Sequence, residues 1–170
     1  MKFQTLGDKP TFVDDFVRND EASTTLQDGT PVVYYMDGTE DGLAVVLPAS
    51  STAIKAHVFF AGVVTEDILV GRIGTVRKTG IHRTTRILRA TRAATSDSWS
   101  SSASLAAGHL LVIDTVNNVL STVAASVGAT GYLPWAILAQ SVASIAASAS
   151  ATSDATTAIT QAAKVFLRVL

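Results

Sequence analysis

The side chains that could carry acid–base or metal chemistry are three histidines, His57, His82 and His109, which lie far apart in the sequence. A metal site built from local sequence needs a spacing such as HxH, HExxH or CxxC, and none occurs. None of the three has a general-base partner in a recognisable motif either. We therefore expect each histidine to have a structural or surface role. Catalysis or ligand binding would require two of them to meet an acid in one pocket.

Other catalytic motifs are equally weak. The adjacent acids Glu66 and Asp67 lie between two apolar runs, where the turn preference of aspartate accounts for them. The serines lack a GxSxG nucleophile elbow, and the glycines lack the spacing of a phosphate-binding loop. Because the chain has no cysteine, it has neither a thiolate site nor a disulfide. The sequence predicts neither an enzyme nor a protein with a cofactor or metal.

A run of basic residues is the most uneven feature of the charge distribution. No acid occurs between Asp67 and Asp97, whereas seven arginines and lysines do. Nucleic-acid modules stack bases on aromatic side chains, but none occurs between Phe60 and Trp99, and the sequence pI is only 6.3. We therefore favour a protein-contact surface over a solvated face, and either of these over a nucleic-acid site. The basic residues are Arg72, Arg77, Lys78, Arg83, Arg86, Arg89 and Arg92.

The first 41 residues carry the opposite charge, with nine acids against three basic residues, a net charge of −6. Separation of charge along a chain favours self-association or docking on an oppositely charged partner. Residues 1–27 also hold Phe3, Phe12 and Phe16, half of the phenylalanines in the chain. We predict an extended N-terminal arm rather than a core element, with at most a short helical turn over Asp14–Arg18. Its phenylalanines would lie either on the protein's own barrel or on a partner.

We expect the candidate residues named above to be positioned by β-strands. From Phe59 to Ile87, short runs of β-branched residues are divided by glycines, a pattern typical of closely spaced strands and unfavourable to a helix. Turns are expected at Asp37-Gly38, Thr79-Gly80 and Asn117-Asn118. The sequence predicts a mainly β protein, either a small barrel or a sandwich. The predicted strands are 31–36, 42–47, 61–65, 73–78, 81–88, 110–114, 119–123 and 164–170, and 132–138 is a further apolar run.

Composition divides the chain into an arm at 1–27, a β-subdomain at 28–92, a Ser-rich linker at 93–108 and a second β part at 109–170. The last part is either a second β-subdomain or the second half of one barrel, and a faint repeat of strand order allows two related β halves.

Only 16% of residues are charged, which indicates either a surface covered by another chain or one made polar by Ser and Thr. The uncharged stretch Tyr132–Ala151 is alanine-rich and contains Pro134, so we expect no membrane span, and no signal peptide is expected.

Two segments resemble a known family. The runs AGVVTEDI and GRIGTV, within Ala61–Val76, and the closing KVFLRVL, within Ala158–Leu170, are similar to head decoration (cement) proteins of tailed bacteriophages. The resemblance implies a small β-rich protein, commonly a homotrimer, that binds the major capsid protein on the capsid exterior of the virion and reinforces the shell. The family has no catalytic residues, and the resemblance does not extend to the arm at 1–27.

We therefore expect a structural virion protein that bridges neighbouring capsid subunits through its arginines and a clasping arm. Two alternatives stay open: another virion subunit, such as a head–tail connector or a tail tube, and a small-ligand-binding β-barrel that uses His57, His82 or His109. The residues expected at a protein interface are Phe3, Phe12, Phe16, Arg72, Arg77, Arg83, Arg86 and Arg89.

Overall fold

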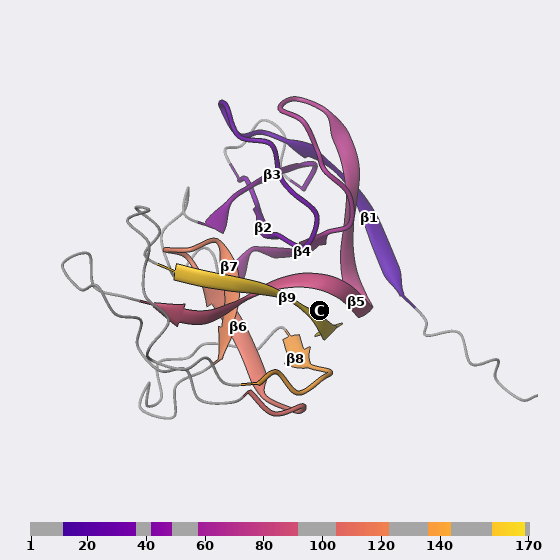
Figure 1. Ribbon diagram of the computed structural model, residues 1–170. Coiled ribbons are helices and arrows are strands. Elements are labelled where there is room, and N and C mark those ends of the chain that lie inside the picture. The colour runs from indigo at the N-terminus through magenta and orange to yellow at the C-terminus, as the bar shows by residue number, and fades with distance from the viewer. Residues whose placement is uncertain are drawn as a thin grey trace, which may run out of the picture.

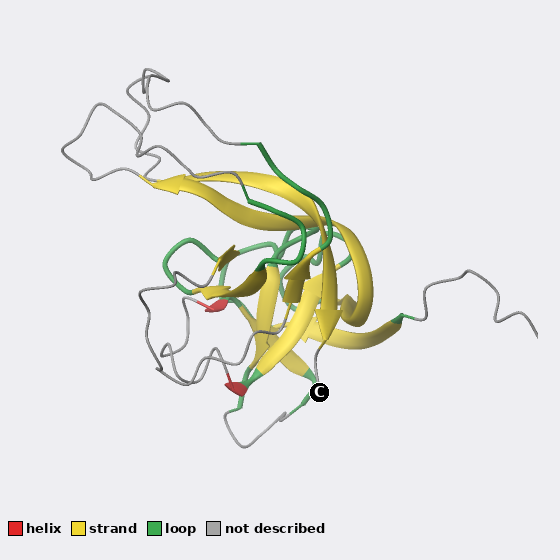
Figure 2. Ribbon diagram, turned by 90° about the horizontal axis from the view of Figure 1, so that it is seen from below, coloured by secondary structure: helices red, strands yellow, loops and turns green. Residues whose placement is uncertain are grey.

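The computed structural model describes residues 12–36, 42–48, 58–91, 105–122, 136–143 and 158–168. The prediction of a mainly β protein is confirmed, and the described strands belong to one hydrogen-bonded sheet (Figures 1 and 2). The strands are β1 (Val13–Asn19), β2 (Pro31–Tyr34), β3 (Ala44–Val46), β4 (Phe60–Val64), β5 (Ile73–Thr91), β6 (Leu110–Asp114), β7 (Val119–Thr122), β8 (Ala136–Leu138) and β9 (Ala158–Arg168).

Five strands close a barrel in the spatial order β1, β3, β2, β4 and β5, because β5 also pairs with β1. The pairing of β1 with β3 is parallel, and the other four pairings are antiparallel. The ladder between β1 and β5 places Val13 opposite Thr79 and Arg18 opposite Ile73. The N-terminal strand is thereby held along much of its length.

The remaining pairings close a second ring, β5, β7, β6, β8 and β9, which shares β5 with the barrel. The antiparallel ladder between β5 and β9 runs from Thr79 opposite Arg168 to Thr91 opposite Ala158. Figure 1 shows β5 curving from its place beside β1 to its place beside β9. The two rings therefore have one strand, β5, in common.

The strands β2, β3 and β4 are buried on both faces, and successive side chains along them enter two different cores. Val32 and Val45 belong to the core of the barrel, whereas their neighbours Val33 and Val46 belong to the core of the second ring. This explains why these segments are near-continuous apolar runs rather than alternating ones. The barrel core is Val17, Leu26, Val32, Val45, Ala61, Val64, Ile68 and Val76.

The expected turn at Thr79-Gly80 is wrong, because β5 continues through it as one strand. Gly80 has a φ of 103°, a conformation open to glycine, and this lets the strand bend without reversing. Beyond the bend, β9 replaces β1 as the hydrogen-bonding partner. The turn at Asn117-Asn118 is confirmed: Asn118 has a φ of 54°, and β6 and β7 pair as an antiparallel hairpin.

For residues 12–27, the expectation of an arm outside the core is wrong, as is the short helical turn over Asp14–Arg18. The strand β1 is part of the barrel, and Val17 and Leu26 are buried in its core. The acids between these apolar residues hid the strand pattern, because Asp14 and Asp15 lie where basic side chains of β5 can reach them. Residues 1–11, the turn at Asp37-Gly38 and the linker from 93 to 104 lie outside the described residues.

Candidate functional site

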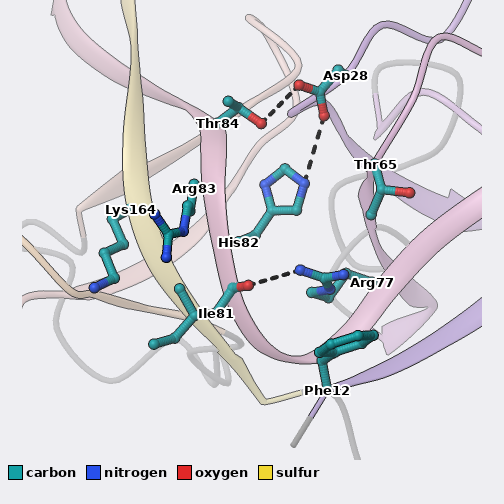
Figure 3. Close-up of a pocket in the computed structure, with 9 residues that line it drawn as sticks. All are labelled: Phe12, Asp28, Thr65, Arg77, Ile81, His82, Arg83, Thr84 and Lys164. Carbon is teal, nitrogen blue, oxygen red and sulfur yellow. Dashed lines mark hydrogen bonds and ion pairs between the residues drawn. The ribbon is translucent and has the colours of Figure 1, made fainter. Parts of the chain in front are cut away.

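A pocket of about 360 Å³ lies where β5 passes from the barrel to the second ring (Figure 3). Its walls come from the start of β1, the loop before β2, the end of β4, the middle of β5 and β9. Cationic, acidic, hydroxyl and apolar side chains all contribute to it. The lining residues are Phe12, Asp28, Thr65, Arg77, Ile81, His82, Arg83, Thr84 and Lys164.

Arg77 forms one wall of the pocket and is fully engaged with its neighbours. Its Nε and Nη2 donate to the two carboxylate oxygens of Asp14 at 2.8 and 3.0 Å, and its Nη1 donates to the carbonyl of Ile81 at 2.9 Å. The ring of Phe12 lies 4.3 Å from the guanidinium carbon, in cation–π geometry. Hydrogen bonding to Asp14 raises the pKa of Arg77, although partial burial opposes it. Arg77 thus joins β1 to the bend in β5.

His82 lies at the back of the pocket with only 4% of its surface exposed. Its Nδ1 is 3.0 Å from Oγ1 of Thr85, and its Nε2 is 3.6 Å from Oδ1 of Asp28. Burial lowers the pKa of His82, and the charge of Asp28 offsets only part of this. The imidazole is therefore neutral at neutral pH, and its contact with Asp28 is not an ion pair there.

Asp28 is fixed by its surroundings on one side only. The hydroxyl of Thr84 donates to its Oδ2 at 2.7 Å, and its backbone N–H donates to Asp67 at 2.9 Å. Its other oxygen, Oδ1, is buried and has no hydrogen-bond partner among the described residues. This oxygen faces Nε2 of His82 rather than the open pocket, and Oδ2 is the carboxylate oxygen that a ligand can reach, because the side chain as a whole is 40% exposed.

The order Asp28, His82, Thr85 superficially resembles an acid–base–hydroxyl relay. The hydroxyl of Thr85 is completely buried, however, and so cannot contact a ligand in the pocket. The arrangement instead explains how a polar group is accommodated inside the sheet. Of the other histidines, His109 is exposed before β6, and His57 lies outside the described residues. Within the ranges described, no group of three or more histidines, aspartates or glutamates is arranged to hold a metal ion.

The structure brings three of the predicted interface residues, Phe12, Arg77 and Arg83, together at this pocket. Arg86 donates to the side chain of Gln27 at 2.8 Å, whereas Arg72 is exposed in the loop before β5. Arg89 lies in β5, and Phe3 lies outside the described residues. The predicted set is thus distributed over the length of β5 and the edge of β1 rather than forming one basic surface.

Part of the charge separation along the sequence is cancelled inside the fold. Besides the Asp14–Arg77 pair, Lys78 lies 3.3 Å from Asp15, which also accepts a hydrogen bond from the hydroxyl of Tyr34 at 3.1 Å. The antiparallel pairing of β1 with β5 places these acids beside these bases. In the sequence, these charges suggest an external partner. In the structure, they instead form ion pairs that join β1 to β5.

A second candidate surface is apolar and lies on the outside of the barrel. Phe16 in β1 and Ile73 in β5 are 71% and 72% exposed. Phe16 is paired with Thr75 and Ile73 with Arg18, so the two apolar side chains are diagonal neighbours on one face. We call Phe16 and Ile73 the β1 apolar patch.

Sequence reasoning selected Phe16 but missed Ile73. Ile73 begins a run that the sequence marks as a buried strand, and only its pairing with β1 shows that its side chain lies on the same face as Phe16. No protein-family model and no curated protein matches the chain. In the part of the chain that the structure describes, no helix is both long and apolar enough to cross a membrane.

Proposed function

We propose that this chain is a structural protein of a phage virion that binds the outside of the capsid and bridges neighbouring copies of the major capsid protein. The observation that carries the proposal is the β1 apolar patch, in which Phe16 and Ile73 expose most of their surface side by side. Exposed apolar clusters on a folded protein mark surfaces that bind other proteins. The resemblance of Ala61–Val76 and Ala158–Leu170 to decoration proteins supports the choice of partner.

The mechanism requires no chemical step. A protein that binds only the assembled shell stabilises the shell by its own binding free energy, because separating the subunits also breaks its contacts. The barrel suits this role, since its rigid closed sheet presents the patch without ordering a flexible segment first. Assembly as a homotrimer would present three patches and multiply the effective affinity.

The test is co-sedimentation of the purified protein with undecorated capsids. The wild-type protein should pellet with them, and the double variant Phe16→Ser/Ile73→Ser should bind at least about thirtyfold more weakly, since the loss of even one hot-spot residue costs about 2 kcal/mol or more. Because both side chains are largely exposed, the variant should keep its fold, which circular dichroism can check.

The matched control is Val116→Ser, which alters an apolar residue that is 82% exposed in the turn between β6 and β7. This variant should bind as the wild type does. Failure of the wild-type protein to sediment with capsids, or equal loss in the control, would contradict the proposal. The solution mass separates the related alternative, because a large ring rather than a trimer would favour a head–tail connector or a tail tube.

A further inference from the structure

Two cations in the pocket lack an acidic partner among the described residues. Arg83 on β5 is exposed and Lys164 on β9 is half-buried, and neither forms an ion pair with any described acid. The third cation, Arg77, is neutralised by the two hydrogen bonds from its guanidinium to Asp14. Among the described residues, the lining of the pocket therefore has two cations without an ion-pair partner and one carboxylate, Asp28.

A β-bulge places the two cations together. His82 is paired with Val165 and Thr85 with Ala163, so both Arg83 and Thr84 lie opposite the single residue Lys164. A bulge changes the direction of the side chains it carries, and bulges are frequent beside binding sites. Figure 3 shows the side chains of Arg83 and Lys164 on the same side of β5.

The pocket also offers a hydrogen-bond acceptor and an apolar wall. The acceptor is Oδ2 of Asp28, which the hydroxyl of Thr84 holds in place, since the Asp28 side chain is 40% exposed although its Oδ1 is buried. Phe12 and Ile81 supply carbon surface on the opposite side. A molecule with an anionic group at one end and a hydroxyl or amine at the other would satisfy both sets of side chains.

We propose that this pocket binds a small organic anion, whose carboxylate or phosphate group contacts Arg83 and Lys164 and whose hydroxyl or amine donates to Oδ2 of Asp28. A guanidinium recognises both kinds of anionic group by two parallel hydrogen bonds, and an ammonium adds a point charge. The volume of about 360 Å³ is at the small end of the range for ligand pockets. The proposal is independent of capsid binding, since it shares no residue with the β1 apolar patch.

His82 makes binding directly observable, because it lines the same pocket. The charged groups around it are Asp28 before β2, Asp14 on β1, Arg77 and Arg83 on β5, and Lys164 on β9. An anion bound among them adds negative charge beside the imidazole, which favours its protonated form. Binding should therefore raise the pH at which His82 titrates, and protonation of His82 should in turn strengthen binding.

The experiment follows the imidazole resonances of the full chain by NMR during separate titrations with sodium phosphate and sodium acetate. Sodium chloride at matched ionic strength is the reference, and the exposed His109 is an internal control. We expect a saturable shift of the His82 resonance and an upward shift of its titration midpoint with at least one of the two anions. Saturation with phosphate alone assigns a phosphate site, and saturation with acetate alone assigns a carboxylate site.

Variants connect the response to the two cations. Arg83→Gln and Lys164→Gln should each weaken anion binding about tenfold, the usual effect of losing one hydrogen bond to a charged group. Arg72→Gln, which removes an exposed arginine of the loop before β5, should leave it unchanged. A His82 response that is linear and equal to that of chloride overturns the proposal, as does full affinity in Arg83→Gln. The Phe16→Ser/Ile73→Ser variant should bind the anion normally, which separates failure here from failure of the capsid proposal.

Discussion

His82 is a titratable side chain placed inside a sheet, and its position has a measurable effect on stability. Because the folded state lowers its pKa, His82 binds a proton more readily in the unfolded chain, where its pKa is near 6.5. The contribution of this group to stability is complete above that value and is lost as the pH falls through the lower pKa of the folded state. Thr85, at 3.0 Å, has a hydroxyl that can donate to the neutral ring.

We therefore predict that the free energy of unfolding decreases between about pH 7 and pH 5, a window that lies largely above carboxylate titration. In His82→Gln this decrease should be much smaller, because the titrating group is removed, whereas His109→Gln should retain it. Urea unfolding at several pH values measures the effect. An unchanged pH dependence in His82→Gln would show that other groups are responsible.

At the scale of the element, β4 depends on one glycine. Gly62 has a φ of 141°, and a Cβ at this position would overlap the carbonyl oxygen of Arg77 on β5. The backbones of β4 and β5 therefore approach each other more closely than a side chain would permit. Gly71 also has a positive φ, of 69°, but a Cβ there would have no atom within 4 Å.

Gly62→Ala should accordingly destabilise the protein by at least about 2 kcal/mol more than Gly71→Ala, because it adds a steric clash to the backbone strain that both share. Chemical unfolding of the two variants measures the difference. Equal effects would mean that β4 and β5 can separate at this point without loss of packing.

The elements also show what could be read from the sequence. The strands predicted at 31–36 and 110–114 correspond to β2 and β6. They could be predicted because a buried strand is rich in β-branched and other apolar residues, which the composition of the segment shows directly. The course of β5 could not be read, since whether Gly80 bends or reverses a strand depends on β1 and β9, which are distant in sequence. The pocket could not be predicted from the sequence for the same reason, because only the strand register places Lys164 opposite Arg83. Arg77, Arg83 and Phe12 were selected by type, but their common location was not.

For the whole molecule, the sharing of β5 couples the two rings. Each ring has its own apolar core, yet β2, β3 and β4 contribute to both, and β5 pairs with members of both. Two rings with this much common structure should unfold together, because opening one removes hydrogen-bonding partners from the other. The apolar patch on the barrel and the pocket at the junction would then belong to one cooperative unit.

Amide hydrogen exchange in Ile87→Ala tests this coupling. Ile87 is completely buried in the core of the second ring, so the substitution should cost about 2–5 kcal/mol. The N–H of Val64, which bonds to Thr30 in the barrel, should lose as much protection as that of Leu138, which bonds to His109 in the second ring. Val116→Ala, at an exposed position, should alter neither amide. If protection falls at Leu138 while Val64 keeps its wild-type value, the rings unfold separately and β5 does not unite them.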